Sequence, residues 1–476
     1  MRPATENMVI VLSIVATLFI SCYFAFIMKD YTSDDALIYY RYIQNCLDGK
    51  GLVYNVGERF NGLTSPLYTY LSLGTAALFQ NILYTQIGLG ALFLFLTSVM
   101  LIPLLKDDLP SPLLIVLPPL LASSVFFYKT FGLETMLFLF LTVLALLLYI
   151  KQKYFLLSVI STLLLLTRGE SIFLLFTLLF FHFRDRRGTL SFKLLFVPAG
   201  ILGIHFIFMY LYYGSFLPHT LTAKIAQGKS GCWGRFAFLH HSQFFFEWYF
   251  GQSFWLISLL AATAVMGLYS IAKSRLIMIM TIFLTLYCMF YIVLNIPDYF
   301  WYYGYLFLML YIFFVLGMKT LYRIFAAMKN SKLRKTGYGI ITAVFMFVFL
   351  KQLTISHANL NNAHGQTEYI TIGKWIETNT EPNAKIACIE IGHIGWYSKR
   401  YIIDILGLVN PYNAEFIGKR KFDEWLKYYT PDYILVWVPL RPHERSVKKL
   451  LAAKQYTVFH EFDFSGWKFQ LLKKTS

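Results

Sequence analysis

The sequence predicts a polytopic α-helical membrane protein that carries a small α/β domain at its C-terminal end. Three observations lead to this prediction. Of the 476 residues, 57% are hydrophobic and only 14% are charged, with a mean hydropathy of +0.56, whereas soluble domains carry about 25% charged residues. Apolar runs suited to crossing a bilayer fill most of the region 1–355. In the region 356–476 the apolar residues instead come in short bursts between charges and turns.

The apolar runs are candidates for membrane spans, because a span needs about 20 residues, or fewer where it is tilted or buried among other helices. The runs lie at 8–27, 64–82, 84–105, 112–128, 133–150, 154–167, 170–183, 190–213, 252–272, 276–295, 302–319 and 336–354. Between 64 and 128 the runs do not alternate correctly across a membrane, so either one of them is re-entrant or one continuous run has been divided in two. We therefore expect about 11 transmembrane helices.

The formal net charge of +17 is concentrated in short connections between the apolar runs, at 184–193, 273–275 and 319–335. Such clusters mark cytoplasmic loops under the positive-inside rule. This rule explains the positive net charge without a nucleic-acid partner. This orientation places the loops 214–250 and 296–301, and the region after about 355, on the non-cytoplasmic face. The loop 28–63 lies on the same face if the N-terminus is cytoplasmic.

The region 356–476 has the size of an ordinary soluble domain. Short β-branched and aromatic bursts predict strands at 384–390, 401–405, 433–438, 457–462 and 467–472. Longer amphipathic segments predict helices at 368–378, 421–428 and 443–453.

The loop 28–63 holds the most informative segment. A helix is expected to begin at Asp34, capped by Thr32 or Ser33, and to lie on the membrane surface with one apolar side. That side is formed by Ala36, Leu37, Tyr40 and Ile43. Acidic residues at a helix N-terminus are favoured by the helix dipole alone. Two in succession, Asp34 and Asp35, at a water–lipid boundary favour a functional role over simple capping.

Several short motifs follow one another in a fixed order from residue 32 to residue 411. They are Asp34-Asp35-Ala36, Gly49-Lys50-Gly51-Leu52-Val53-Tyr54-Asn55, Gly57-Glu58-Arg59, Thr64-Ser65-Pro66-Leu67, Gly132-Leu133-Glu134-Thr135, Thr167-Arg168-Gly169-Glu170, the segment 213–224, and Asp404 to Pro411. In this order they resemble the GT-C class of integral membrane glycosyltransferases. The pattern is most similar to arabinofuranosyltransferases that add terminal β-(1→2)-arabinofuranose in mycobacterial cell walls. That family usually has Arg-Pro-Glu or Arg-Pro-Asp at 168–170 and Leu-Pro-Asn at 217–219, and these differences leave the donor sugar open.

The resemblance implies transfer of a sugar, in this family a pentofuranose, from a polyprenyl-phosphate donor to a hydroxyl of a cell-envelope glycan or glycolipid. The reaction would invert the anomeric carbon, at the periplasmic face of a bacterial cytoplasmic membrane. Asp34 matches the first-loop aspartate of the class and is expected to be the general base. Asp35 would be a second, orienting acid, and the ligand if a divalent cation takes part.

The remaining candidates fall into two groups. Cations suited to the donor phosphate are, in falling order of preference, Arg168, Lys224, Arg59 and His219. Polar groups suited to sugar hydroxyls are Glu134, Glu170, Asn61, Asp404 and Asn410. Arg168 and Glu170 have an alternative, which is to pair with each other at a helix break. The aromatic run 299–303 is interpreted as an interfacial belt.

Two other functions compete with the enzyme. A transporter or flippase of lipid-linked sugars also needs intramembrane charges, but transporters tend to contain internal repeats, and none is evident in this sequence. A non-catalytic scaffold for polysaccharide assembly is the second alternative. The variant Asp34→Asn distinguishes both alternatives from the enzyme. If the protein is an enzyme, the variant should lose its transferase activity while its expression and folding are unchanged.

Overall fold

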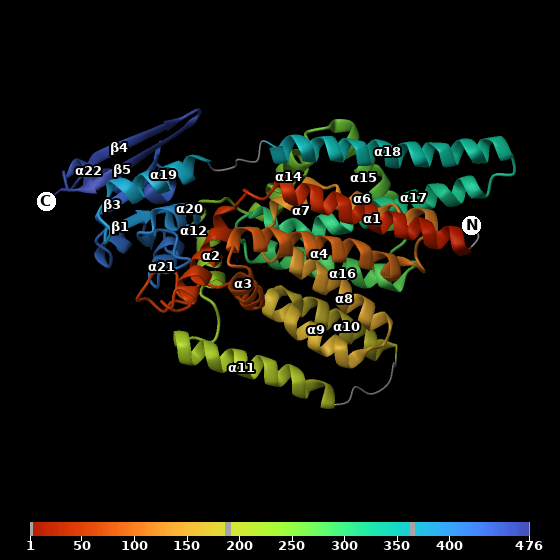
Figure 1. Ribbon diagram of the computed structural model, residues 1–476, viewed down its shortest axis with the longest axis horizontal. Coiled ribbons are helices and arrows are strands. Elements are labelled where there is room, and N and C mark those ends of the chain that lie inside the picture. Colours follow the sequence, from red (N-terminus) through yellow and green to blue (C-terminus); the bar gives the residue numbers. More distant parts are fainter. Residues whose placement is uncertain (1–2, 186–191, 362–366, 476) are drawn as a thin grey trace.

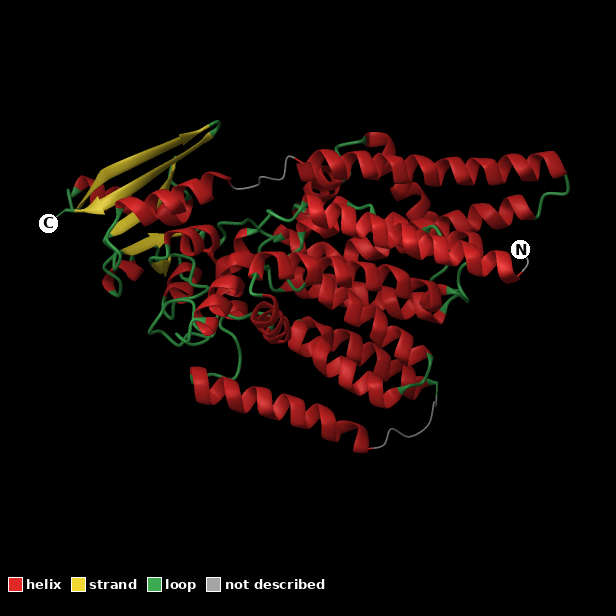
Figure 2. Ribbon diagram, viewed as in Figure 1, coloured by secondary structure: helices red, strands yellow, loops and turns green. Residues whose placement is uncertain are grey.

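The computed structural model describes residues 3–185, 192–361 and 367–475. The basic residues Arg186 and Arg187 and the beginning of the predicted run 190–213 lie outside this range. Long helices run side by side through most of the molecule, and all the strands gather at one end, with the N-terminus at the other (Figures 1 and 2). This arrangement confirms a helical bundle followed by a C-terminal α/β domain.

Within the described residues, seven stretches are long and apolar enough to cross a membrane. They are Asn7–Ile27 in α1 (Pro3–Ile27), Ile82–Leu105 (α4), Ser111–Lys129, Phe196–Tyr213 (α11), Arg275–Val293 (α16), Phe300–Ala326, and Ser331–Leu360 in α18 (Ser331–Asn361). A pair bent by 120°, Ala237–Tyr249 with Phe254–Leu268 (α15), adds an eighth if it forms one span. Shorter helices are α8 (Thr135–Ile150), α9 (Tyr154–Thr167) and α10 (Ile172–Arg184). The chain is an integral membrane protein, and the total of about 11 spans stays a prediction.

The helices of the region 64–128 show why its apolar runs do not alternate across a membrane. α3 (Pro66–Phe79) has only 14 residues and is seen nearly end-on in Figure 1, so it runs across the long helices. At 1.5 Å per residue it spans roughly 21 Å, less than a bilayer core. The run 84–105 forms the continuous helix α4, whereas the run 112–128 is divided into α5 (Ser111–Leu114), α6 (Leu117–Ala122) and α7 (Val125–Lys129).

The C-terminal domain contains one five-stranded sheet in the order β2-β1-β3-β5-β4. Its strands are β1 (Lys385–Cys388), β2 (Tyr401–Asp404), β3 (Tyr433–Val438), β4 (Tyr456–Phe464) and β5 (Trp467–Lys474). β1 pairs in parallel with β2 and β3, whereas β5 is antiparallel to β3 and β4. All five strands lie where the sequence predicted them.

The helices of this domain agree less well with the prediction. α19 (Thr367–Asn379) was expected, but 421–428 contains only a 3-10 turn, Glu424–Lys427, and 443–453 only α22 (Val447–Ala452) after the turn Pro442–Glu444. α20 (Ile391–Ser398) and α21 (Asn413–Gly418) were not predicted. α18 continues to Asn361, past the predicted domain boundary at 355.

α2 (Asp34–Leu47) lies at the junction between the bundle and the sheet domain (Figure 1). The prediction that it begins at Asp34 is confirmed, but Ser33, at its N-cap position, makes no capping hydrogen bond. The helix is also not a surface helix, because it packs against both α3 and α20. Glycine permits the contact with α20, since a Cβ at Gly392 would collide with the backbone oxygen of Asp34.

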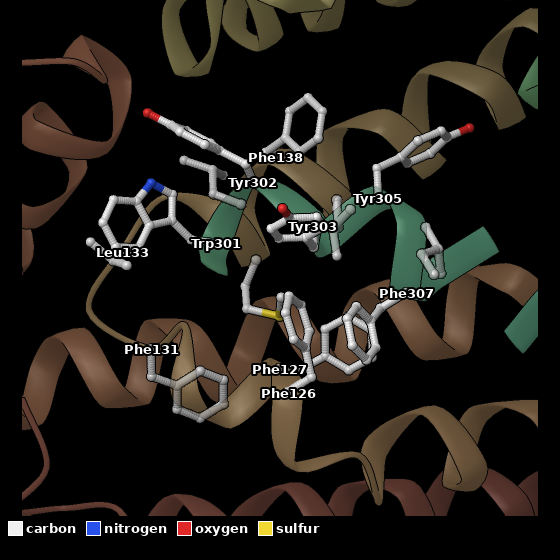
Figure 3. Packing of buried hydrophobic residues seen from close by; sticks show 14 of the residues in the cluster. Phe126, Phe127, Phe131, Leu133, Phe138, Trp301, Tyr302, Tyr303, Tyr305 and Phe307 are labelled. Atoms are coloured by element: carbon white, nitrogen blue, oxygen red, sulfur yellow. The ribbon is translucent and has the colours of Figure 1, made fainter. Parts of the chain in front are cut away.

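An aromatic core lies within the helical bundle (Figure 3). Phe126 stacks on Phe307 with ring centroids 3.9 Å apart. The turn η3 (Phe300–Tyr303), which leads into α17 (Gly304–Ala326), buries Trp301, Tyr302 and Tyr303. The interpretation of 299–303 as an interfacial aromatic belt is therefore wrong for these three side chains, which are buried in the bundle.

Candidate active site

A pocket with an empty volume of about 420 Å³ opens where the bundle meets the C-terminal domain. Its walls come from α2, the loop before α3, the turn before α8, α12 (Thr220–Ser230), η3 and the loop after β2. The lining residues are Asp35, Ile38, Tyr39, Gly62, Thr64, Leu133, Glu134, Lys224, Trp301 and Leu408. Trp301 and Leu133 lie beside each other in Figure 3. The pocket therefore joins segments from almost the whole length of the chain.

Asp35 is the carboxylate that α2 contributes to this pocket. Burial raises its pKa to about 7; Lys224 opposes this rise, and the charges of Asp34, Glu134 and Asp404 add to it. The described residues donate no hydrogen bond to its carboxylate, so both oxygens are available to a bound molecule. A carboxyl group with a pKa near neutrality is suited to accept a proton at physiological pH.

Lys224 is the cation that faces into the pocket, with only 6% of its surface exposed. Its Nζ lies 2.5 Å from Tyr302 Oη and 5.1 Å from the centre of that ring. The rings of Tyr299 and Trp301 also lie within cation–π range, at 5.4 and 5.9 Å. Burial lowers the pKa of Lys224, but the neighbouring Tyr302 and Asp35 outweigh burial and leave the pKa above its ordinary value. The side chain is therefore a fixed positive charge.

Arg168 is a second buried cation, directly behind the pocket and 4% exposed. Its Nε lies 2.8 Å from Glu170 Oε1 and 3.8 Å from Glu134 Oε1. Its guanidinium also lies 4.9 Å from the centre of the Tyr302 ring, so both cations contact the same aromatic side chain. Within the described residues, Nη1 is buried without a hydrogen-bond partner. The pairing of Arg168 with Glu170 exists, but it leaves one donor of the guanidinium unused.

The two glutamates occupy different layers. Glu134 lines the pocket and accepts a hydrogen bond from Tyr39 Oη at 3.5 Å. Glu170 lies behind it, where it accepts one hydrogen bond, from Tyr291 Oη, and is paired with Arg168. Glu134 is therefore placed to contact a ligand, and Glu170 is placed to orient Arg168.

Asp34 points elsewhere. Its carboxylate accepts hydrogen bonds from the backbone nitrogens of Gly392 at 2.9 Å and His393 at 2.7 Å. Its Oδ1 also lies 3.0 Å from Nδ1 of the His393 ring. Asp34 thus binds the first turn of α20, where anions are favoured, and is not among the residues that line the pocket.

Asp404 and Asn410 shape a loop of the C-terminal domain. The Asp404 carboxylate accepts hydrogen bonds from the backbone nitrogens of Leu406, Leu408 and Val409. Burial raises its pKa to about 6, and these hydrogen bonds oppose the rise. Asn410 Oδ1 accepts a hydrogen bond from the Asp404 backbone nitrogen. The loop brings Leu408 to the pocket, whereas the two predicted polar side chains stay buried behind it.

The other predicted residues also lie outside the pocket lining. The Asn61 backbone oxygen accepts a hydrogen bond from the His219 backbone nitrogen at 3.0 Å, and the His219 ring stacks on Phe60. Arg59 is exposed and lies 4.8 Å from the Tyr212 ring. Asn61 and His219 join the first loop to the start of α12, and so hold Gly62, Thr64 and Lys224 in place.

Several pocket residues were not predicted. Ile38 and Tyr39 follow Asp35 by three and four residues, a helical spacing that places them on the same face. That spacing is a signal in the sequence that would have found them. Trp301, and Tyr302 which contacts Lys224 beside the pocket, gave no such signal, because their run looks like an interfacial belt. No group of three or more His, Cys, Asp or Glu side chains that could hold a metal ion occurs in the described ranges.

The bundle, the C-terminal α/β domain and the pocket between them define the class of this protein: a polytopic membrane protein with a GT-C-like fold. Two crystal structures of ArnT from Cupriavidus metallidurans share this fold. The ArnT structure bound to undecaprenyl phosphate matches with a TM-score of 0.60 and 10% sequence identity, over 100% of this chain and 99% of ArnT. The apo structure matches with a TM-score of 0.54 and 9% identity, over 93% of each chain.

Comparisons of sequence say less about this chain. Residues 357–474 match a family described as a domain of unknown function (DUF8728). No curated protein matches the sequence.

Proposed function

We propose that this protein is a glycosyltransferase that moves a sugar from a polyprenyl-phosphate donor to a hydroxyl of a cell-envelope glycan or glycolipid. One observation carries the proposal: a pocket carboxyl group with a pKa near 7 faces a buried lysine, in a fold that matches ArnT over the whole chain. The ArnT structure contains undecaprenyl phosphate, which is a polyprenyl phosphate. The chemistry of the pocket suits the same class of lipid.

Asp35 is the general base in this proposal. The acceptor hydroxyl oxygen attacks the anomeric carbon, the bond from that carbon to the phosphate oxygen breaks, and the hydroxyl proton passes to Asp35. The sequence favoured Asp34 for this role. We assign the role to Asp35 because the Asp34 carboxylate is bound to the backbone of α20.

The leaving group is polyprenyl phosphate, which gains negative charge as the bond breaks. Lys224 supplies a positive charge within the pocket. Arg168 adds a second positive charge behind the pocket, next to the ring of Tyr302. Its buried Nη1 has no hydrogen-bond partner among the described residues and is a free donor for the phosphate. Fixed cations in a site with little water stabilise such charge strongly, since they need no reorganisation when it develops.

Glu134, Tyr39 and Thr64 lie on the remaining wall. Their oxygens are suited to hydrogen-bond the hydroxyls of the donor sugar, and Glu170 keeps Arg168 in position behind them. A single displacement with one base predicts inversion at the anomeric carbon. The family resemblance of the first loop favours a pentofuranose as the donor sugar. It also favours an orientation in which the pocket faces the periplasm.

The test is transfer of radiolabel from a panel of polyprenyl-phosphate sugars to endogenous acceptors in membranes that contain the wild type, Asp35→Asn or Asp34→Asn. We expect Asp35→Asn to lower transfer about 100-fold or more, the usual contribution of a general base. A protein that moves the donors across sealed vesicles without forming a glycoside is a flippase, and that result would overturn the proposal. Absence of both transfer and transport in the intact wild type would favour the scaffold.

A further inference from the structure

A second face of α2, toward its C-terminal end, lines a second, larger groove. Asp35, Ile38 and Tyr39 face the pocket, whereas a different set faces the groove. That set is Arg41, Gln44, Asn45 and Asp48. Successive helical residues are about 100° apart, so the centres of the two sets lie roughly 120° apart around the helix axis, and the groove set lies further along the helix. The groove has an empty volume of about 1220 Å³, compared with about 420 Å³ for the pocket.

The floor of the groove is held in place by side chains that bind backbone carbonyls. Arg41 donates hydrogen bonds to the carbonyl oxygens of Tyr54 at 2.8 Å, Gly395 at 2.7 Å and Arg400 at 2.6 Å. Asn45 donates to the carbonyl oxygen of Val53 at 2.9 Å. These contacts join the first loop to α20 and β2, so the groove is formed in the free protein.

The two walls of the groove carry charged side chains. On one wall Lys50 pairs with Asp48 at 2.9 Å, and on the other Lys399 pairs with Glu377 at 2.7 Å. Lys374 has no carboxylate partner among the described residues and lies 5.6 Å from the ring of Tyr397. With Arg41 included, four cations face two anions, so the groove has a surplus of two positive charges.

Two half-buried aromatic side chains, Trp396 and Tyr397, lie between these walls. Together with Gln44, they add ring faces and an amide to the charged groups. Ring faces suit the C–H surfaces of sugar rings, amides suit hydroxyls, and lysines suit carboxylates or phosphates. An acyl chain or an apolar peptide would instead have to desolvate the charged walls at a cost that its burial does not return.

We infer that this groove binds an anionic stretch of the acceptor saccharide. The inference rests on the proposed function, because it assigns the acceptor to a class of carboxylated or phosphorylated glycans. Arg41, the first groove residue of α2, follows Asp35 by six residues, about 9 Å along the helix axis, so a saccharide held in the groove lies beside the same helix that carries Asp35. Binding there would hold a distal part of the acceptor while its terminal hydroxyl reaches the pocket.

The test measures binding of fluorescent tetragalacturonate, a carboxylated tetrasaccharide, to the purified full-length protein in detergent. Maltotetraose is the neutral probe, and inorganic phosphate is the competitor. The double variant Lys50→Gln/Lys374→Gln removes the surplus charge without touching Arg41 or the pocket. Lys421→Gln/Lys448→Gln is the matched control, because it removes two exposed lysines of the C-terminal domain that do not line the groove.

We expect the wild type to bind tetragalacturonate about tenfold or more tightly than maltotetraose, and the groove variant to lose about tenfold or more in affinity. The control variant and Asp35→Asn should bind as the wild type does, since neither alters the groove. Three results would overturn the inference. The wild type could bind maltotetraose as tightly as tetragalacturonate, or the groove variant could bind tetragalacturonate as tightly as the wild type does. Inorganic phosphate could also displace tetragalacturonate completely at equal concentration. Binding that survives while no donor supports transfer would refute the proposed function but leave the groove as a site for anionic saccharides.

Discussion

The Asp34 carboxylate lies 2.7 Å from the backbone nitrogen of His393 and 3.0 Å from Nδ1 of the same residue. These residues are far apart in the sequence, and their contact joins the first loop of the membrane part to α20 of the C-terminal domain. Because Asp34 is turned toward α20, the next residue, Asp35, is turned toward the pocket. The contact thus determines which of two adjacent aspartates lines the pocket.

Replacement of Asp34 should affect stability before chemistry. Asp34→Ala removes the acceptor for two backbone donors, and hydrogen bonds to charged groups contribute roughly 1.5–3 kcal/mol. We expect a lower melting temperature in detergent, and a smaller decrease for Asp34→Asn, which keeps one acceptor oxygen. Thermal unfolding and transfer are measured on the same preparations. If Asp34→Asn abolished transfer at an unchanged melting temperature, Asp34 would be the base that the sequence suggested.

The pH dependence of transfer should report on Asp35. Its pKa of about 7 means that the carboxyl group is protonated, and unable to accept a proton, at lower pH. Activity should therefore rise as the pH increases through about 7, and below that it should fall about tenfold per pH unit. Initial rates at saturating donor, measured between acidic and weakly basic pH, give this profile. A rate that is flat across this range would exclude Asp35 as the base.

Replacement of Lys224 should shift the pH profile of transfer. The positive charge of Lys224 lowers the pKa of Asp35, although burial raises it more. Lys224→Met removes this charge, so the remaining activity should need a higher pH, and its maximum should be at least about tenfold lower because a phosphate-stabilising cation is lost. An exposed lysine such as Lys448 is the control. A loss of rate with an unshifted profile would mean that Lys224 acts on the phosphate alone.

The same pKa has a consequence for stability. The pKa of Asp35 is raised in the folded protein, so ionisation of Asp35 costs folding free energy, and this loss grows as the pH rises from the unfolded pKa of about 4 through the folded pKa. Asp35→Asn cannot ionise and should escape this loss. We expect the variant to melt at a higher temperature than the wild type at pH 8, with a smaller difference at pH 5. The opposite order would show that the Asp35 carboxylate is stabilised in the fold.

The outcome for individual residues shows what a sequence can convey about this site. The start of α2 at Asp34 and all five strands follow from local patterns of apolar and turn residues. Adjacent aspartates differ by about 100° around a helix, so only the docking of α20 decides which one faces the pocket. α20 itself was not predicted, because Gly392 and Gly395 disfavour a helix by themselves and are needed for contacts with Asp34 and Tyr54.

The same reasoning applies to the polar residues of the motifs. Arg168, Glu134 and Lys224 are rare charges in apolar surroundings, and such residues indicate function whatever their partners. Asp404 and Asn410 carry a similar signal, yet they bind backbone groups of their own loop. A polar residue that shapes a loop and one that contacts a ligand can occur in the same motif. Only hydrogen-bond partners distinguish them.

The close contact between α2 and α20 leads to a last prediction. A Cβ at Gly392 would collide with the Asp34 backbone oxygen, so Gly392→Ala must push the two helices apart. Such overpacking costs roughly 1–3 kcal/mol, and here it also moves Asp35 relative to Lys224. We expect a lower melting temperature together with a loss of transfer. The control is Gly339→Ala in α18, where a Cβ meets open space and alanine favours the helix by up to about 1 kcal/mol. Full transfer by Gly392→Ala would show that the pocket does not depend on this contact, and that the C-terminal domain can shift without disturbing the base.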